Sequence, residues 1–183
     1  MKKYWLWASV IIVFLITSIY FISQRNSFQN IPVSSYFYDT YQPADFTIDG
    51  IGLGSSAAKV IEKFGTPAKR SQTTDEAYQN PDYMVYWDTW NYPGLTIKFL
   101  SSCKKNKPAP KLPDKVFSII VSSTKYETFR GIKIGDQYTK VLEKYGATRK
   151  EDNSYNYGVD LLSIQFKISK GIVTKIILDS TFD

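Results

Sequence analysis

The fold of this chain is decided by a stretch of sixteen residues that occurs twice. Residues 131–146 read Gly-Ile-Lys-Ile-Gly-Asp-Gln-Tyr-Thr-Lys-Val-Leu-Glu-Lys-Tyr-Gly, and residues 50–65 read Gly-Ile-Gly-Leu-Gly-Ser-Ser-Ala-Ala-Lys-Val-Ile-Glu-Lys-Phe-Gly. The outer glycines, the apolar positions and the Glu-Lys pair coincide when the copies are displaced by 81 positions. Self-similarity of this kind indicates an internal duplication.

Each copy predicts a short amphipathic helix between its outer glycines. Ser55 and Asp136 stand at the expected N-caps, where a side-chain oxygen satisfies an unpaired backbone N–H. Gly65 and Gly146 stand where a left-handed C-terminal residue is favoured. The apolar stripes recur at helical spacing and comprise Ala57, Val60, Ile61 and Phe64 in the first copy and Tyr138, Val141, Leu142 and Tyr145 in the second. A helix of about ten residues is too short to be stable alone in water, so each must pack on a larger apolar surface.

The sequence after each helix predicts that surface. We expect a polar loop over residues 66–82, followed by antiparallel strands over 83–90, 95–99 and 116–121 in the first copy and over 154–157, 162–168 and 172–178 in the second. The offset between copies falls to 67 at the alternating strand and 57 at the last, so the first copy carries loop insertions of fourteen and ten residues.

The predicted fold class is therefore α+β. It comprises two tandem repeats of a short helical segment packed on a three- or four-stranded antiparallel sheet, over residues 45–123 and 124–183, preceded by one N-terminal transmembrane helix.

The N-terminal segment predicts a membrane anchor. Residues 4–22 are uncharged, follow Lys2 and Lys3, and as a helix would span about 28 Å, close to the hydrocarbon thickness of a bilayer. Two lysines before the run favour a cytoplasmic N-terminus, with residues 1–23 as a signal-anchor and the C-terminal domain outside the cytoplasm at the cell membrane. The alternative is a signal peptide that is cleaved, leaving a secreted domain.

Residues 24–44 predict a tether, because polar residues and prolines break any periodicity. Its aromatic residues either pad the edge of the folded domain or lie on the membrane surface or a partner; they are Tyr36, Phe37, Tyr38 and Tyr41.

Composition narrows the possible functions. The chain of 183 residues has a net charge of +6, no histidine and one cysteine, Cys103, so it can form no intrachain disulfide. We find no paired carboxylates, nucleophile–base dyad or metal-ligand cluster in the sequence, and residues 50–54 lack the Gly-Lys-Ser/Thr of a phosphate-binding loop. We therefore expect no enzyme, catalytic residue, cofactor or metal, and no nucleic-acid partner, because a wider basic face is missing.

Two features are candidates for binding. The strand at 83–90 is apolar on both faces, with Tyr83, Val85 and Trp87 on one side and Met84, Tyr86 and Trp90 on the other. One side must cover the helix, and the other is either a binding surface or covered by the tether. Because exposed aromatics anchor protein interfaces, the candidate partner-binding residues here are Tyr86, Trp87, Trp90 and Tyr92.

The second candidate is a lysine-rich insertion at residues 101–115. Its prolines favour an extended loop, and its candidate binding residues are Lys104, Lys105, Lys107 and Lys111. Such a loop is either a finger for an anionic surface, such as lipid headgroups or a wall polymer, or a solvated hairpin tip.

These motifs resemble a known family. Gly-Ile-x-Ile/Leu-Gly opening a short helix that ends Lys-Phe/Tyr-Gly, followed by Tyr-rich and alternating strands, is similar to the beta-lactamase-inhibitor-protein-like repeat, which the BamE-type outer-membrane assembly lipoproteins share. The resemblance covers residues 45–178 and implies a helical segment on an antiparallel sheet with an exposed face, in a non-enzymatic binding module outside the cytoplasm. This chain lacks the lipidated cysteine of the lipoproteins and the disulfides of the inhibitor, and no residue of either carries over.

The sequence thus predicts a membrane-anchored extracytoplasmic binding module without catalytic activity, which recognises a protein or a cell-envelope component. The alternative is attachment to anionic lipid or wall polymer through residues 101–115.

Overall fold

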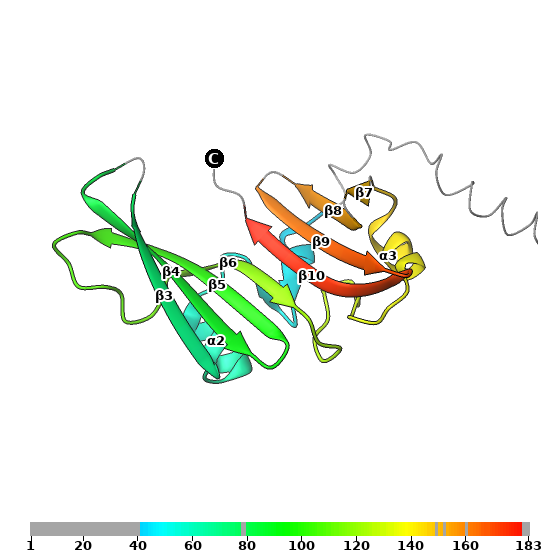
Figure 1. The fold of residues 1–183 in the computed structure, drawn as a ribbon, viewed down its shortest axis with the longest axis horizontal. Coiled ribbons are helices and arrows are strands. Elements are labelled where there is room, and N and C mark those ends of the chain that lie inside the picture. The colour runs from blue at the N-terminus through cyan, green and yellow to red at the C-terminus, as the bar shows by residue number, and fades with distance from the viewer. Residues whose placement is uncertain (1–40, 78–79, 149, 152, 160, 181–183) are drawn as a thin grey trace, which may run out of the picture. The chain divides into compact units, whose positions relative to one another are not determined.

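The computed structural model describes residues 41–77, 80–148, 150–151, 153–159 and 161–180, and the α+β class is confirmed for them (Figure 1). In chain order the elements are the 3-10 helix η2 (Pro43–Phe46), β1 (Thr47–Ile48), β2 (Ile51–Gly52), α2 (Ala57–Phe64), β3 (Lys69–Glu76), β4 (Tyr83–Tyr92), β5 (Leu95–Lys104), β6 (Lys115–Val121), α3 (Tyr138–Tyr145), β7 (Lys150–Glu151), β8 (Ser154–Val159), β9 (Leu162–Ser169) and β10 (Ile172–Ser180).

The predicted anchor and most of the predicted tether lie in residues 1–40, outside the described residues. In the described part of the chain, neither helix has the length and apolar character needed to cross a membrane.

The two repeats form one antiparallel sheet rather than two. Its eight strands follow the order β3-β4-β5-β6-β10-β9-β8-β7, and β1 and β2 form a separate hairpin. In each repeat the chain starts at one edge of the sheet and adds strands inwards, so β3–β6 and β7–β10 are equivalent meanders. They meet where β6 pairs with β10.

The hydrogen bonds that seat the helices repeat between the two halves. Val116 exchanges two backbone hydrogen bonds with residues 54 and 55, each 2.8 Å long, and Val173 exchanges two with residues 135 and 136, each 2.9 Å long. These hydrogen bonds hold the segment before each helix against the start of the last strand of its own meander. The bonded residues of the two repeats are separated by 81 positions before the helices and by 57 positions in the last strands, the same offsets as in the sequence.

Both helices begin one residue later than predicted. Ser56 and Gln137 occupy the N-cap positions in place of Ser55 and Asp136. The side-chain oxygens of Ser55 and Asp136 instead accept hydrogen bonds from the backbone N–H groups three residues earlier, at 3.1 and 2.8 Å. These hydrogen bonds close the turn that precedes each helix. The donors are the N–H groups of Gly52 and Lys133, and not N–H groups in the first turn of the helix, as a capping role would require.

Both helices end at the predicted glycines. Gly65 and Gly146 have φ of 77° and 83°, in the region that glycine adopts without steric cost. The hydroxyl of Tyr92 donates to the carbonyl of Gly65 at 3.1 Å, and that of Tyr157 donates to the carbonyl of Gly146 at 3.0 Å. Equivalent tyrosines therefore hold the end of each helix on its own sheet.

The predicted offset of 67 at the alternating strand was wrong. Leu95 lies opposite Tyr92, and Ile164 lies opposite Tyr157, so Leu95 corresponds to Ile164 and not to Leu162. The offset is 69, so the first repeat has a net excess of twelve residues between its helix and β5 and of twelve between β5 and β6. Alternation repeats every two residues, so sequence matching alone does not distinguish registers that differ by two.

The junction of the repeats has pseudo-two-fold symmetry. Val121 pairs with Ile176, Ile119 pairs with Leu178, and Ile120 pairs with Ile177 between them. By the offset of 57, Ile120 and Ile177 are each other's equivalents, so the approximate axis passes through this central pair.

The prediction of a polar loop over residues 66–82 was wrong, because residues 69–76 form β3, an eight-residue edge strand. Every residue of β3 is exposed, and none is apolar. The strand therefore carries no hydrophobic alternation, which is the signal on which strand prediction depends.

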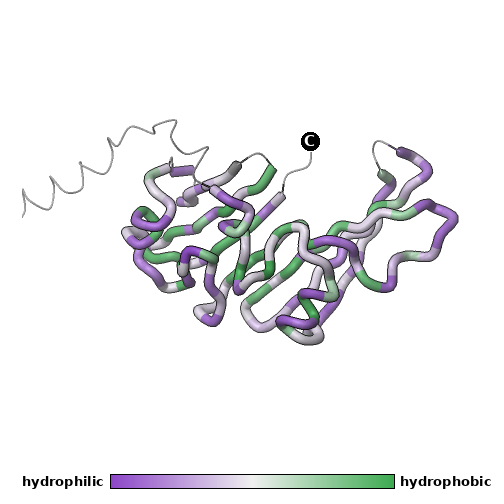
Figure 2. The backbone as a smooth tube through the Cα atoms, turned by 180° about the vertical axis from the view of Figure 1, so that it is seen from behind, coloured by the Kyte–Doolittle hydropathy of each residue, from purple (hydrophilic) through white to green (hydrophobic). Residues whose placement is uncertain are grey.

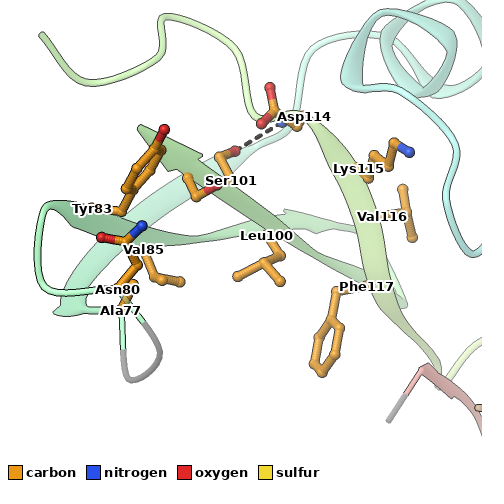
Figure 3. A pocket seen from close by; sticks show the side chains of 11 residues that line it. Ala77, Asn80, Tyr83, Val85, Leu100, Ser101, Asp114, Lys115, Val116 and Phe117 are labelled. Atoms are coloured by element: carbon orange, nitrogen blue, oxygen red, sulfur yellow. Dashed lines mark hydrogen bonds between the residues drawn. The ribbon is translucent and has the colours of Figure 1, made fainter. Parts of the chain in front are cut away.

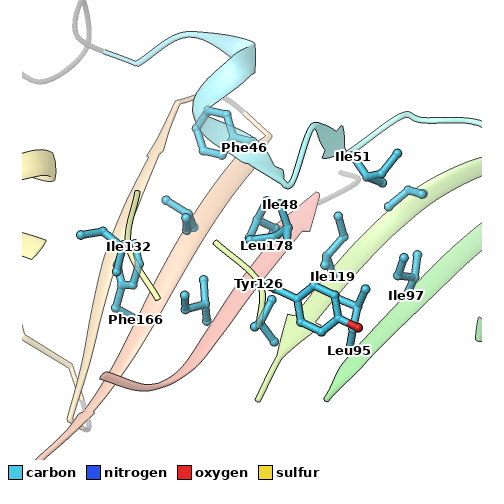
Figure 4. Packing of buried hydrophobic residues seen from close by; sticks show 14 of the residues in the cluster. Phe46, Ile48, Ile51, Leu95, Ile97, Ile119, Tyr126, Ile132, Phe166 and Leu178 are labelled. Atoms are coloured by element: carbon cyan, nitrogen blue, oxygen red, sulfur yellow. The ribbon is translucent and has the colours of Figure 1, made fainter. Parts of the chain in front are cut away.

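One side of the sheet, here called the covered face, packs against both helices and the β1–β2 hairpin. Figure 4 shows side chains of η2, β1 and β2 meeting those of β5, β6, β9 and β10, and together they form a single buried cluster. Figure 2 shows hydrophobic and hydrophilic residues alternating along the strands, as expected when one face packs on a core.

The segment before the first repeat packs on the second. Tyr41 is buried, and its hydroxyl donates to the carbonyl of Tyr145 at 2.8 Å. Asp45 accepts two hydrogen bonds from the guanidinium of Arg130, at 2.6 and 2.7 Å. Tyr41 therefore pads the edge of the domain, as one of the two interpretations expected; Tyr36, Phe37 and Tyr38 lie outside the described residues.

Candidate functional site

The opposite side of the sheet, here called the open face, carries apolar side chains in its first repeat. Alternation along β4 directs Tyr83, Val85 and Trp87 to this face, because Asp88, Trp90 and Tyr92 are buried on the other side. Register then places Leu100 of β5 opposite Trp87. All of these open-face side chains are half-buried.

Three of these open-face side chains line a groove of about 530 Å³, and Trp87 stands beside it. Its apolar lining comes chiefly from Tyr83, Val85, Leu100 and Phe117, and the ring of Trp87 meets that of Phe117 edge-on, with centroids 5.4 Å apart. Figure 3 shows Val85, Leu100 and Phe117 projecting from three successive strands. We call these five residues the aromatic groove.

A β-bulge contributes one of the groove residues in the first repeat. Phe117 is the extra residue where Phe99 pairs with Val116 and Lys98 pairs with Ser118. The equivalent bulge in β10 falls at Thr174, which is exposed and polar. Bulges often redirect a side chain beside a functional site.

The four aromatic residues predicted as partner-binding divide between the two faces. Trp87 lies on the open face, whereas Trp90 and Tyr92 lie on the covered face and are 1% and 9% exposed. Trp90 packs on Phe99 with ring centroids 4.5 Å apart. A partner on the open face therefore cannot reach Trp90 or Tyr92, which stabilise the core.

Tyr86 is half-buried on the covered face, where it lies opposite Ser101 in the next strand. A hydrogen bond with the Cys103 thiol raises the pKa of Tyr86. Cys103 itself is half-buried, with its sulfur 3.8 Å from the carbonyl oxygen of Pro108. This pair lies away from the aromatic groove.

The four predicted lysines lie in the β5–β6 hairpin, where Lys104 and Lys105 are close to Tyr83 and the carbonyl of Lys111 accepts a hydrogen bond from Arg70. Lys104 is opposite Tyr83 in the register, and a second open groove of about 530 Å³ is lined by Tyr83, Lys104 and Lys105, among others. Lys105 Nζ lies 2.8 Å from Glu76 Oε1. The hydrogen bond from Lys105 lowers the pKa of the Glu76 carboxyl. The ammonium groups of Lys104, Lys107 and Lys111 make no ion pair with the described residues and are exposed.

The buried charges of the described residues have structural partners. Asp88 accepts from Arg70 Nε at 2.6 Å and from Gln72 Nε2 at 2.7 Å. Although burial opposes ionisation of Asp45, the hydrogen bonds from Arg130 and the Gln42 N–H hold its pKa below the usual value. Both carboxylates are fully engaged, so neither presents a free acid or base.

No group of three or more His, Cys, Asp or Glu side chains that could hold a metal ion occurs in the described part of the chain. The candidate site presents aromatic and aliphatic surface in the groove, with the ammonium groups of Lys104 and Lys105 close to Tyr83.

Sequence reasoning did not predict Leu100 or Phe117 as site residues. Leu100 is placed by cross-strand register and Phe117 by a bulge, and neither has a local sequence signal. The remaining groove residues, Tyr83 and Val85, could be found from their i, i+2 spacing to Trp87.

Comparison of the chain with models of protein families, with curated proteins and with solved structures found no match.

Proposed function

We propose that this protein is a membrane-anchored extracytoplasmic binding module without catalytic activity, which recognises a protein or a cell-envelope component through the open face of its sheet. The observation that carries the proposal is the aromatic groove: Trp87, Leu100 and Phe117 stand together on the face opposite both helices.

The composition of this face favours a binding role. Aromatic residues are enriched at the centres of protein interfaces, where Trp and Tyr supply most of the binding energy. Here Trp87 and Tyr83 are half-buried along a single strand, Tyr83 and Phe117 line the groove, and the ring of Trp87 packs edge-on against Phe117. A partner side chain that fills the groove would remove apolar surface from water, at about 25 cal/mol per Å².

The surroundings favour a partner with polar or acidic groups at its rim. Lys104 lies beside Tyr83 at one end of the groove, Lys107 and Lys111 follow it in the same hairpin, and none of the three has an ion-pair partner among the described residues. Rim charges of this kind affect association rate and selectivity more than they affect affinity.

The proposed location, outside the cytoplasm and anchored to the membrane, is inferred from the sequence alone. The uncharged run over residues 4–22 supports a single-pass anchor with the binding unit outside the cytoplasm. The resemblance to the beta-lactamase-inhibitor-protein-like repeat supports the same class of function.

Site-specific photocrosslinking in living cells tests the proposal. A photoreactive amino acid is placed at Leu100 in the full chain, with Glu62, which is exposed on α2, as the matched control position. We expect a discrete adduct from position 100 that is absent from position 62 and that Trp87→Ala weakens.

Two outcomes would reject the proposed site. One is the same set of adducts from both positions, and the other is an adduct from position 100 that Trp87→Ala leaves unchanged in a folded protein.

The second candidate function is attachment to anionic lipid or wall polymer through the lysines of residues 101–115. Three exposed ammonium groups on one hairpin favour it, since each basic residue near an anionic membrane contributes about 1 kcal/mol. Cosedimentation of the full chain with anionic wall material at two salt concentrations distinguishes the candidates. The triple variant Lys104→Gln/Lys107→Gln/Lys111→Gln should lose salt-sensitive binding, and the control Lys59→Gln/Lys63→Gln/Lys125→Gln, with the same change in charge, should retain it.

A further inference from the structure

The two edges of the sheet differ in a way that points to self-association. β3 and β7 occupy equivalent positions in the two repeats, at opposite edges. β7 has two residues, whereas β3 has eight, and all eight are exposed. Natural sheets avoid edge-to-edge pairing with edge strands that are short, bulged, interrupted by proline or charged. β7 is short, whereas β3 is long, has no proline and pairs with β4 without a bulge, and its charges lie only at its two ends.

The charges of β3 are arranged with opposite signs at its two ends. Lys69 and Arg70 begin the strand, Asp75 and Glu76 end it, and the four residues between them are uncharged. In an antiparallel pair of two such strands, the basic end of each lies beside the acidic end of the other. A parallel pair would instead place like charges side by side, which is destabilising.

Internal contacts identify which of these charges are available. Arg70 is bound to Asp88, and Glu76 is bound to Lys105. Lys69 and Asp75 make no side-chain hydrogen bond or ion pair with the described residues. Their register partners in β4 are Asn91 and Val85, so both side chains belong to the open face.

We propose that β3 pairs antiparallel with β3 of a second copy of this chain, in the register that sets Lys69 opposite Asp75 of the other copy. In this register Ser71 lies opposite Thr73, and the two-fold axis passes between the two Gln72 residues. The contact is isologous, so the Lys69–Asp75 ion pair forms twice, once at each end, and the assembly closes as a dimer. The unpaired backbone groups of both edges are then satisfied.

Swapping the charges at positions 69 and 75 tests the antiparallel arrangement. The experiment uses the full chain purified in detergent. Lys69→Asp places two aspartates opposite each other at both ends of the contact, and we expect it to raise the dimer dissociation constant about tenfold or more. Asp75→Lys should do the same by pairing lysines. The double variant Lys69→Asp/Asp75→Lys should restore dimerisation, because each Asp then faces a Lys again. Sedimentation over a concentration series measures each constant.

Disulfide crosslinking tests the register in a Cys103→Ser background. Opposite residues of antiparallel strands have Cα atoms about 4.5–5.5 Å apart, within the range that a disulfide bridges. A mixture of Ser71→Cys and Thr73→Cys chains carrying different tags should form a mixed dimer under mild oxidation, and neither variant should crosslink to itself.

Several results would overturn the proposal. They are a monomer at all concentrations together with no mixed crosslink, a double charge variant that dimerises no better than the single ones, or self-crosslinking of Thr73→Cys alone, which requires another register. Capture of a different protein at this edge, with dimerisation absent, would also overturn it. Although Asp75 and Thr73 neighbour Val85 and Trp87 in the register, no groove residue takes part in the proposed strand pairing, so the absence of a wild-type dimer does not bear on the crosslinking at Leu100.

Discussion

At the scale of single residues, two buried carboxylates hold polar segments to the core. Asp88 is 1% exposed and binds Arg70 and Gln72 of β3, and Asp45 is 2% exposed and binds Arg130. A buried carboxylate is tolerated only where hydrogen bonds and an opposite charge replace its hydration. Each arginine therefore fixes the position of a segment that has little apolar surface of its own.

Asp45→Asn should lower the free energy of unfolding by about 2–4 kcal/mol, because it leaves the partly buried Arg130 without its counter-charge. The matched control is Glu143→Gln, since the Glu143–Lys144 pair is solvent-exposed and should contribute less than about 1 kcal/mol. Urea unfolding of both variants measures the difference. Equal, small losses would show that the Asp45–Arg130 pair does not hold the N-terminal segment in place.

The same pair should make stability depend on acidic pH. The pKa of Asp45 is lowered in the folded state, so its contribution is present above the ordinary carboxyl pKa of about 3.9 and is lost as the pH falls through the lower folded value. The stability gap between the wild type and Asp45→Asn should therefore narrow progressively below about pH 4. Urea unfolding at pH 7 and pH 3 measures it, and a constant gap would contradict the assignment.

The two helix-end tyrosines should be equivalent in energy as well as in position. Tyr92→Phe and Tyr157→Phe each remove one hydrogen bond to a helix-terminal carbonyl, so each should cost about 1 kcal/mol of stability. Tyr83→Phe is the control, since its hydroxyl makes no hydrogen bond with the described residues and its loss should be near zero. A cost in one repeat only would argue against equivalent roles.

At the scale of elements, β3 is the clearest case of a strand set by tertiary contacts. Its sequence from Lys69 to Glu76 has no apolar residue, yet it pairs with β4 along its whole length. Arg70 and Gln72 extend to the buried Asp88, and Lys105 reaches Glu76 from the next hairpin. Polar contacts therefore hold β3 in the sheet, whereas hydrophobic burial holds the other long strands.

Asp88→Asn should loosen β3 selectively. Replacing one carboxylate oxygen by an amide donor breaks at least one of the two bonds from β3, so amide exchange of residues 69–76 should quicken about tenfold or more. Exchange in β9 should change much less, since it lies in the other repeat. Hydrogen-exchange mass spectrometry compares the two strands, and unchanged protection of β3 would mean that backbone pairing alone maintains it.

The elements that the sequence predicted are those with a strong local pattern. The helix stripes ending at Phe64 and Tyr145, the end glycines and the alternating strands all follow from the order of residues. Trp87 could be assigned to a face by alternation, but which face was free depended on the rest of the fold. The bulge at Phe117, the register of Leu100 and the joining of β6 to β10 are long-range pairings with no local signal.

At the scale of the whole described unit, the duplication forms one sheet rather than two domains in series. The junction lies at the centre of the sheet, where Ile119 and Leu178 are both completely buried. The two repeats share a single core. The open face is therefore a continuous surface across both repeats, with the aromatic groove in one of them.

Leu178→Ala should destabilise both repeats together. Truncating a fully buried leucine lowers the free energy of unfolding by about 2–5 kcal/mol. Because Leu178 lies at the junction, we expect amide hydrogen exchange to become faster in β4 as well as in β9. Ala57→Gly on α2 is a control that acts on one repeat and costs about 1 kcal/mol. Faster exchange confined to β9 after Leu178→Ala would indicate two independently stable repeats.

Binding of the partner through the open face can be tested by one affinity comparison. Using the partner trapped at position 100, binding is measured for Trp87→Ala and for Phe129→Ser, which removes an aromatic residue 64% exposed and outside the groove. We expect Trp87→Ala to weaken binding about 30-fold, the effect of losing an interface anchor, and Phe129→Ser to leave the affinity unchanged. Unchanged affinity in a folded Trp87→Ala protein, or a loss on Phe129→Ser alone, would contradict binding through the open face.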